Sequence, residues 1–283
     1  MIPSAFDYVR AATLEHAFAA LDDGGEDAKI LAGGHSLIPA MKLRLSTPSL
    51  LIDISRIPGL QGLTVQGDAM RIGALTTHAA LAASDELRAF APALWDAANV
   101  LGDPQVRNRG TIGGACAHAD PAADYPPVLV ALDARLELSR RGGSREVAAG
   151  EFFRGLFDTA LAQGEIVTAI VVPAAPVSAY VKFPHPASHY AVVGVAASLS
   201  LDGGTIRSAR VVVGGAGDAP ARAPVVERAL AGVRAQDVQA VRAACAGAAN
   251  PRDARSDTFA SATYRVAMAD VFAARAVGRA AAR

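Results

Sequence analysis

Two glycine pairs about eighty positions apart constrain the fold of this chain more than any other feature. The first lies in the stretch Ala32-Gly33-Gly34-His35-Ser36 and the second in Thr111-Ile112-Gly113-Gly114. Where a loop leaves an apolar strand, the missing Cβ atoms let its backbone amides come close to a ligand or to another segment. Either pair alone is better explained as an ordinary tight turn. Together they predict two loops that clamp a pyrophosphate from both sides.

The composition excludes several classes of function. The chain has 283 residues, enough for two or three small domains, and 52% of them are hydrophobic. Lys plus Arg equal Asp plus Glu at 27 each, and this zero net charge argues against general binding to nucleic acids or membrane surfaces. The two cysteines, Cys116 and Cys245, are far apart and lack a partner motif. This excludes an internal cysteine-ligated iron–sulfur cluster and a disulfide framework.

The sequence also predicts where in the cell the protein is located. The first residues do not show a basic region followed by an apolar run, which a secretory signal would need. No stretch reaches the roughly 20 uninterrupted apolar residues that span a bilayer. We therefore expect a soluble, cytoplasmic protein.

Periodicity and turn residues divide the chain into three regions. The first is a β-α-β unit that ends near residue 57, with a helix at 13–21, strands at 28–32 and 49–54, and a short helix within 37–45. The second ends at Pro173 and Pro176, with expected strands at 63–65, 70–72, 128–138 and 166–172 and helices at 77–81 and 92–100. The third has expected strands at 180–183, 190–201 and 206–213 and helices at 224–230, 235–248 and 261–277.

No catalytic constellation can be read from the sequence. The glycine-rich stretch 211–217 imitates a dinucleotide-binding fingerprint, but Asp218-Ala219-Pro220 follows it in place of a helix. There is no Walker-type motif, Ser-His-Asp set or readable carboxylate pair. His35 and His118 lie in the glycine loops, but a metal site needs three or four ligands at workable spacing, so contacts with backbone or solvent explain them better. This pattern fits a protein whose cofactor carries the chemistry.

Asp124 is the carboxylate best placed for a ligand. It follows the second glycine loop on its far side, where it could accept hydrogen bonds from polyol hydroxyls. An ordinary turn role is equally open on chemistry alone. Asp120, before Pro121, fits a turn, and Asp7 and Asp53 fit strand ends or turns.

These residues resemble a known family. Residues 32–45 resemble the first FAD loop of the medium, flavoprotein subunit of molybdenum hydroxylases, and residues 103–114 with 120–126 resemble the second. Residues 2–8 and 182–191 also match that pattern, so the resemblance covers nearly the whole chain. The branch most similar is the carbon monoxide dehydrogenase medium subunit, and xanthine dehydrogenase carries a related FAD domain.

The resemblance implies an α+β fold. A two-part N-terminal FAD-binding domain with a vanillyl-alcohol-oxidase-like fold would comprise residues 1–57 and 58–176. A smaller α+β domain, with a three-stranded antiparallel sheet and helices, would comprise residues 178–283.

The resemblance also implies the site residues. The expected FAD-binding set is Ala32, Gly33, Gly34, His35, Ser36, Leu37, Thr111, Ile112, Gly113, Gly114, Ala115, Asp124, Val167, Lys182 and Tyr190. The two glycine loops would bind the pyrophosphate largely through backbone amides, and Asp124 would hold the ribityl chain. Val167 would lie beside the cofactor, and Lys182 and Tyr190 would lie near the flavin ring, where a cation stabilises reduced flavin. Ala115 departs from the family pattern because it removes a side-chain hydrogen bond at that point. No catalytic residue and no metal ligand are expected in this chain.

The implied function is that of an FAD-binding electron-transfer subunit of a molybdenum-containing hydroxylase. A large subunit would oxidise substrate at molybdenum, and a small subunit with two iron–sulfur clusters would pass electrons through FAD to an external acceptor, commonly in a doubled heterotrimer. One alternative is a free-standing FAD oxidase or reductase with its own small substrate. Another is a chaperone or scaffold that has lost flavin, which the two intact glycine pairs and Asp124 argue against.

Overall fold

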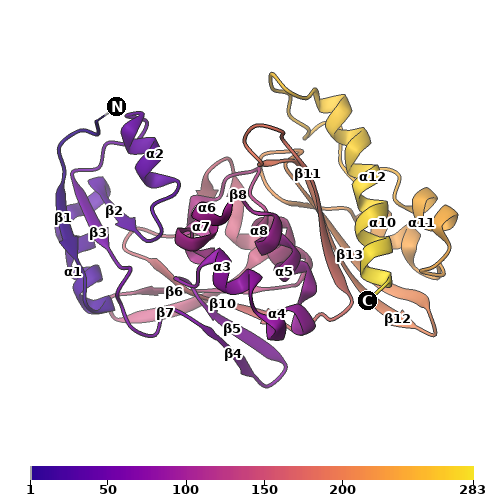
Figure 1. The fold of residues 1–283 in the computed structure, drawn as a ribbon, viewed down its shortest axis with the longest axis horizontal. Helices are drawn as coiled ribbons and strands as arrows, with labels where there is room; N and C mark the ends of the chain where they lie inside the picture. The colour runs from indigo at the N-terminus through magenta and orange to yellow at the C-terminus, as the bar shows by residue number, and fades with distance from the viewer. Residues whose placement is uncertain (1) are drawn as a thin grey trace.

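Three structural units follow one another along the longest axis of the molecule (Figure 1). The computed structural model describes residues 2–283. Its sheets have three, five and four main strands from the N-terminal to the C-terminal unit, and each unit has a cluster of buried hydrophobic side chains. Leu75 and Ile166 of the middle unit pack into the N-terminal cluster, so the first two units share one core region. The domain limits at residues 57 and 176 stay predictions.

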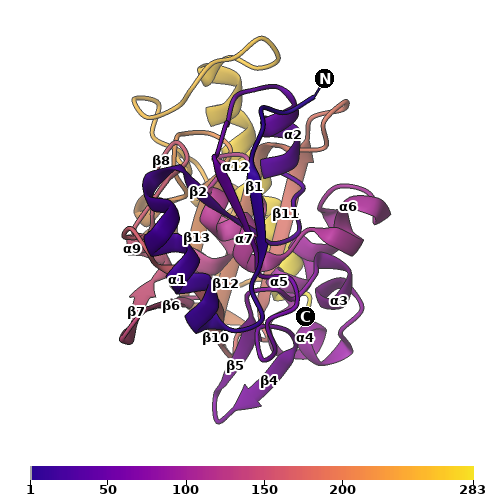
Figure 2. The same ribbon diagram turned by 90° about the vertical axis from the view of Figure 1, so that its left-hand side faces the viewer.

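The N-terminal unit is a parallel sheet whose strands are connected by helices. Its strands β1 (Asp7–Arg10), β3 (Leu50–Asp53) and β2 (Ala28–Leu31) lie in that order, and α1 (Leu14–Gly24) and the short 3-10 helix η1 (Gly25–Asp27) connect β1 to β2. The hydroxyl of Thr13 accepts the N–H of His16 at 3.1 Å and caps α1. Figure 2 shows this unit from its own end of the molecule. A second helix, α2 (Leu37–Lys42), connects β2 to β3, so the expected β-α-β unit is confirmed, but β1 was missed because its largely exposed residues show no buried alternation.

The middle unit is built on an antiparallel sheet whose central strand comes last in sequence. The order is β4 (Leu63–Gln66), β5 (Ala69–Gly73), β10 (Ile166–Pro173), β6 (Arg135–Arg140) and β7 (Gly143–Ala148). The other elements are α3 (His78–Ala82), α4 (Asp85–Phe90), α5 (Pro92–Val100), α6 (Pro104–Arg109), α7 (Ile112–His118), α8 (Tyr125–Ala131), α9 (Ala149–Phe152), β8 (Phe153–Gly155) and β9 (Asp158–Thr159).

The expected strand at 128–138 is wrong in its first half. Helix α8 extends to Ala131, and strand β6 begins only at Arg135. Every residue of α8 is buried, so its apolar run has no solvent-facing side and shows no helical period.

The C-terminal unit is an antiparallel sheet covered on both faces. Strands β11 (Ser178–Pro184), β12 (Ala191–Asp202) and β13 (Thr205–Gly214) confirm the expected three-stranded sheet, which the two-residue β14 (Ala221–Arg222) extends. Its remaining helices are α10 (Pro224–Leu230), α11 (Val238–Ala244) and α12 (Ala262–Ala281). Side chains alternate along β12: Val195 and Ala197 pack with the helices of this unit, and Ala196 packs with α5 and α8 of the middle unit.

A buried carboxylate strengthens the joint between the last two units. Asp96 on α5 accepts the backbone N–H of Tyr180 at 3.1 Å and guanidinium N–H groups of Arg279 and Arg283 at 2.7 and 2.8 Å. Its side chain is 1% exposed, so the two arginines compensate a desolvated charge.

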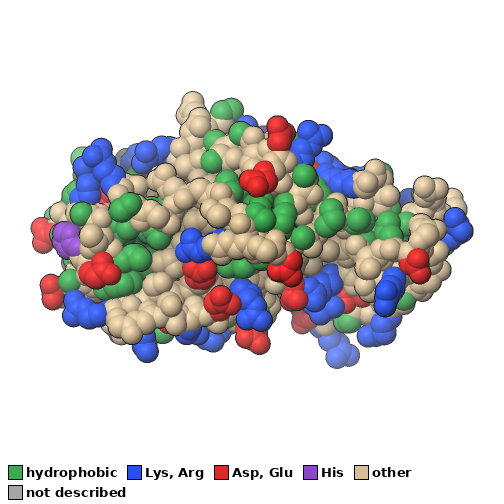
Figure 3. All heavy atoms as spheres, turned by 90° about the horizontal axis from the view of Figure 1, so that it is seen from below, with side chains coloured by type: hydrophobic (Ala, Val, Ile, Leu, Met, Phe, Trp, Pro, Cys, Tyr) green, Lys and Arg blue, Asp and Glu red, His purple; other side chains and the backbone are tan. Residues whose placement is uncertain are grey.

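The surface carries mixed charges. Figure 3 shows Lys and Arg interspersed with Asp and Glu on the face drawn there, as expected for a chain of zero net charge. Within residues 2–283, no helix has the length and apolar character needed to cross a membrane.

Candidate functional site

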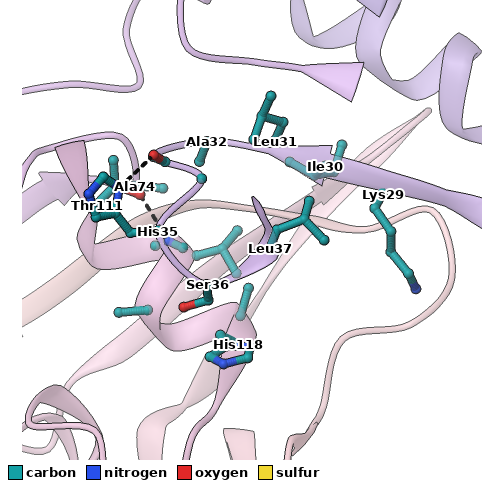
Figure 4. Close-up of a pocket in the computed structure, with 18 of the residues that line it drawn as sticks. Lys29, Ile30, Leu31, Ala32, His35, Ser36, Leu37, Ala74, Thr111 and His118 are labelled. Carbon is teal, nitrogen blue, oxygen red and sulfur yellow. Dashed lines mark hydrogen bonds between the residues drawn. The ribbon is translucent and has the colours of Figure 1, made fainter. Parts of the chain in front are cut away.

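A cavity of about 920 Å³ lies where the N-terminal unit meets the middle unit. Its size is within the range of small-molecule and cofactor sites. All of the residues predicted to bind FAD line it except Ile112 and Lys182. Figure 4 shows the segment that carries His35, Ser36 and Leu37 opposite the helix that carries Thr111 and His118. The two glycine pairs therefore come together in one cavity.

The first glycine pair forms an open loop between β2 and α2 (Leu37–Lys42). Gly34 has a φ of 75°, a conformation that favours glycine. A Cβ added to Gly33 would lie 2.2 Å from the carbonyl oxygen of Arg109, so this loop can touch the segment before α7 only because Gly33 has no side chain. The side-chain Nδ1 of His35 lies 3.2 Å from the carbonyl oxygen of Gly33.

The amides of this loop are free. In the structure of residues 2–283, the N–H groups of residues 33–36 make no hydrogen bond with another protein group. Four adjacent unbonded donors in residues that line a cavity suit an anionic ligand such as a pyrophosphate. The first loop is therefore open, and its binding of a pyrophosphate stays a prediction.

The second glycine pair differs from the prediction, because it lies in the first turn of α7 and follows no strand. The N–H groups of Ile112 and Gly113 bond to the carbonyls of Thr76 and Ala74 at 3.1 and 2.8 Å. The N–H of Gly114 bonds to the hydroxyl of Thr111 at 3.2 Å. This segment thus uses its amides within the protein, contrary to the expectation that it offers them to a ligand.

These glycines instead allow neighbouring segments to pack closely against α7. A Cβ on Gly113 would lie 2.4 Å from the Cβ of Ala74, so the helix packs directly on the end of β5. A Cβ on Gly114 would point toward Ala32, 3.8 Å from its Cβ, on the opposite wall of the cavity. The missing side chains bring the two walls close together. Of the neighbouring predicted residues, Ala115 lines the cavity, while Ile112 is fully buried in the hydrophobic cluster of the middle unit.

Asp124 lies in the cavity wall and is held by two residues of β11. Its Oδ1 accepts the hydroxyl of Tyr180 at 2.7 Å, and its Oδ2 accepts Nζ of Lys182 at 2.9 Å. The side chains of Asp124 and Lys182 are 6% and 4% exposed. Burial raises the pKa of Asp124 above its ordinary value, while Lys182 and the hydroxyl of Tyr180 act in the opposite direction.

Lys182 therefore differs from the sequence prediction. Its ammonium group lies behind Asp124, and it does not line the cavity as a cation facing a flavin ring would. Its contact with the cavity is indirect, because it orients the carboxylate that does line it. The ion pair also connects the middle unit to the C-terminal unit.

Val167 and Tyr190 line the cavity from two further elements. Val167 is a buried residue of the central strand β10. Tyr190 is 45% exposed and ends a tight loop after β11, in which Nδ1 of His185 accepts the N–H groups of Ala187 and Ser188, both at 3.2 Å. The backbone of His185 closes this loop by donating to the carbonyl of Tyr190 at 2.8 Å.

Several residues that line the cavity were missed in the sequence, and His78 and Phe157 are two of them. His78 at the start of α3 is 4% exposed, and one ring nitrogen, Nδ1, lies 2.9 Å from the hydroxyl of Tyr125. Burial, followed by the charges of His35 and Arg107, lowers the pKa of His78 to about 4, so the ring is neutral at pH 7. Phe157, between β8 and β9, is the other. Neither lies in a recognisable motif, and only the fold brings them to the cavity.

His35, His118 and Cys116 were the other candidates for metal or thiol chemistry. Among residues 2–283 no three His, Cys, Asp or Glu side chains are grouped as a metal site, so His35 and His118 have no co-ligands there. Cys116 is fully buried, and burial raises the pKa of its thiol well above the usual range. The 211–217 stretch is strand β13 and the turn after it, as its lack of a following helix predicted.

Two family models match consecutive parts of the chain. The model described as "FAD binding domain in molybdopterin dehydrogenase" matches residues 4–175, and "CO dehydrogenase flavoprotein C-terminal domain" matches residues 178–280.

Individual relatives match over most or all of their length. The carbon monoxide dehydrogenase medium chain of Afipia carboxidovorans is 40% identical over 286 residues, which is 100% of this chain and 99% of the relative. The 6-hydroxypseudooxynicotine dehydrogenase complex subunit alpha of Paenarthrobacter nicotinovorans is 42% identical over 234 residues, which is 81% of this chain and 79% of the relative. A chain in the crystal structure of Cu,Mo-CO dehydrogenase is similar with a TM-score of 0.92 at 38% identity, and the match covers 100% of this chain and 99% of that chain.

Proposed function

The chain belongs to the FAD-binding medium subunits of the molybdenum hydroxylases, and from this premise we propose that it binds FAD in the cavity and acts as an electron-transfer subunit. In this role it receives electrons from iron–sulfur clusters of a partner subunit and passes them to an external acceptor. Bound FAD supplies the one- and two-electron redox chemistry that the side chains of the chain lack.

The single observation that carries the proposal is the loop of four free amides at residues 33–36, which line the cavity. These donors would hold the pyrophosphate, because a row of amides offers several hydrogen bonds to phosphate oxygens. The cavity of about 920 Å³ is large enough for the dinucleotide, and the close approach at Gly33, Ala32 and Gly114 would hold its two walls together around the ligand. The residues present therefore fit the group.

The carboxylate of Asp124 would orient the ribityl chain. Each of its oxygens already accepts one hydrogen bond from β11, and a carboxylate oxygen can accept a further one. Lys182 and Tyr180 would hold that carboxylate in place and so act as positioning residues. Val167 and Tyr190 would form apolar and aromatic contacts with the cofactor. The proposal keeps all fifteen predicted residues, of which Ile112 and Lys182 do not line the cavity and would support residues that do.

The redox partners are proposed to be separate chains. A large molybdenum subunit would oxidise the substrate, and a small subunit would carry the two iron–sulfur clusters, in a doubled heterotrimer. The two cysteines of this chain are both buried, and two are too few for a cluster that needs four thiolates. The relatives are named for different substrates, carbon monoxide and 6-hydroxypseudooxynicotine, which supports the proposal that a partner subunit selects the substrate.

The test begins with the protein purified together with the chains that copurify with it. We expect flavin absorption near one FAD per copy of this chain, and iron–sulfur absorption only in fractions that also contain larger and smaller chains. A chain that fails to take up added FAD, alone or assembled, refutes the proposal.

A matched pair of variants tests the cavity itself. Gly33→Ala places a Cβ on the backbone of Arg109 and should abolish FAD uptake, whereas Gly143→Ala, with no atom within 4 Å of the added Cβ, should leave it unchanged. Substrate-driven bleaching of flavin in the isolated chain would instead favour the free-standing oxidase or reductase.

A further inference from the structure

Phe157 adopts a backbone conformation that a phenylalanine disfavours. The two-residue turn Leu156-Phe157 joins β8 to β9, with Gly155 opposite Asp158. Phe157 has a φ of 54°. A bulky residue is rare in this left-handed region, where a turn ordinarily uses glycine or asparagine. The turn therefore keeps a strain that glycine would remove.

The strain has no compensation in the hydrophobic core. The side chain of Phe157 is 54% exposed. Within residues 2–283 it belongs to none of the three buried hydrophobic clusters. Its aromatic neighbour is His118, whose ring centroid lies 5.0 Å away. Because strained residues persist where function needs them, the exposed ring requires an explanation other than folding.

The position of the ring provides that explanation. Phe157 lines the cavity, as do His118 at the end of α7 and Leu161 beyond β9. Leu156, the other residue of the turn, is 55% exposed but does not line the cavity. Of the two apolar side chains of this turn, only that of Phe157, the residue in the left-handed conformation, therefore lines the cavity.

We propose that Phe157 is a binding residue for FAD, and that the strained turn holds its ring against one of the planar rings of the dinucleotide. The proposal rests on the proposed function. An aromatic side chain gains both buried area and ring–ring attraction from such a contact. His118 packs beside this ring at a tilt of 42° between the two ring planes.

The inference predicts opposite effects on folding and on binding. Phe157→Gly and Phe157→Asn relieve the left-handed strain, so Tm of the flavin-free full chain should rise by about 2 °C. The same variants should weaken FAD binding by about tenfold, because the ring is lost. Phe157→Tyr keeps the ring and should keep the wild-type affinity. Leu156→Ala is the matched control from the same turn and should change the FAD affinity less than twofold.

The measurement is FAD titration into flavin-stripped protein, purified with its copurifying chains, followed by flavin fluorescence. Equal FAD affinity of wild type, Phe157→Gly and Phe157→Asn overturns the inference, whatever happens to Tm. Weaker binding accompanied by a lower Tm also overturns it, because the loss would then follow from damaged folding. A wild-type protein that binds no FAD refutes the proposed function instead.

Two partial ligands identify which ring is contacted. If Phe157 contacts the isoalloxazine ring, Phe157→Gly weakens FMN and leaves ADP unchanged, and flavin fluorescence is less quenched in the variant. If it contacts the adenine ring, the variant weakens ADP and leaves FMN unchanged. An unchanged affinity for both ligands overturns the inference.

Discussion

Replacing Lys182 by methionine removes the cation that accompanies the buried carboxylate of Asp124. Both side chains are at most 6% exposed and their charged atoms are 2.9 Å apart. At an effective dielectric constant of about 20, two unit charges at this distance attract by about 6 kcal/mol, most of which offsets their desolvation. Removing one partner leaves an uncompensated buried charge, which typically costs about 3–5 kcal/mol.

We therefore expect Lys182→Met to destabilise the flavin-free chain by about 4 kcal/mol, or about 8 °C in Tm for a chain of this size. Asp124→Asn should cost about 3 kcal/mol, because it leaves the ammonium group buried. In the double variant neither charge remains, so it should be no less stable than Lys182→Met, with a coupling energy of about 3 kcal/mol.

A second ion pair provides a control that differs mainly in burial. Arg210 on β13 and Asp133 after α8 also connect the middle and C-terminal units and are also 2.9 Å apart, but their side chains are 39% and 65% exposed. Because water screens such a pair, Arg210→Met should cost less than about 1 kcal/mol.

The assay is thermal unfolding monitored by circular dichroism and by the fluorescence of Trp95. Trp95 is the only tryptophan of the chain and lies on α5, which packs against β11, so it reports on this joint. A coupling energy below about 1 kcal/mol, or equal losses for Lys182→Met and Arg210→Met, would refute the idea that burial makes the inner pair strong.

Three further predictions concern the rest of the site. Gly33→Ala should also lower Tm, because its Cβ would lie 2.2 Å from the carbonyl oxygen of Arg109, whereas Gly143→Ala should not; a Tm difference within error contradicts this. The pKa of His78 is about 4 in the folded chain, against an ordinary value of 6.5. As pH falls, the unfolded chain therefore binds this proton at a higher pH than the folded chain does. The free energy of unfolding should fall by up to about 3 kcal/mol between pH 6.5 and pH 4. Denaturant titrations at both pH values should show that His78→Gln lacks this part of the loss. Cys116 should react with a thiol reagent only after unfolding, because its thiol is buried and protonated.

Features that depend on neighbours in sequence were predictable. The Gly67-Asp68 and Gly203-Gly204 hairpins and the start of α5 at Pro92 follow from turn and capping residues. The open loop at residues 33–36 follows from a short apolar strand that ends in two glycines. In each case the structure is determined within a few residues.

Features that depend on distant partners were not predictable. The N–H groups of Ile112 and Gly113 in α7 bond to the carbonyls of Thr76 and Ala74, 36 and 39 positions earlier in the sequence. No local pattern predicts those acceptors. The ammonium group of Lys182 donates to the carboxylate of Asp124, 58 positions away in the sequence. The lysine that was expected beside a flavin ring therefore orients Asp124. Residue types indicated segments that line one cavity but left open which of their groups face into it.

The central position of β10 has a consequence for the order of folding. The sheet of the middle unit consists of two hairpins, β4–β5 and β6–β7, and β10 pairs with one member of each. A two-stranded hairpin alone is marginally stable in water, and a chain is synthesised from its N-terminus. The edges of β5 and β6 that pair with β10 therefore stay unpaired until residues 166–173 have left the ribosome. Because Val167 on β10 and Tyr190, further along the chain, both line the cavity, the proposed cofactor site would be complete only after both have been synthesised, and cofactor binding would come late in biosynthesis.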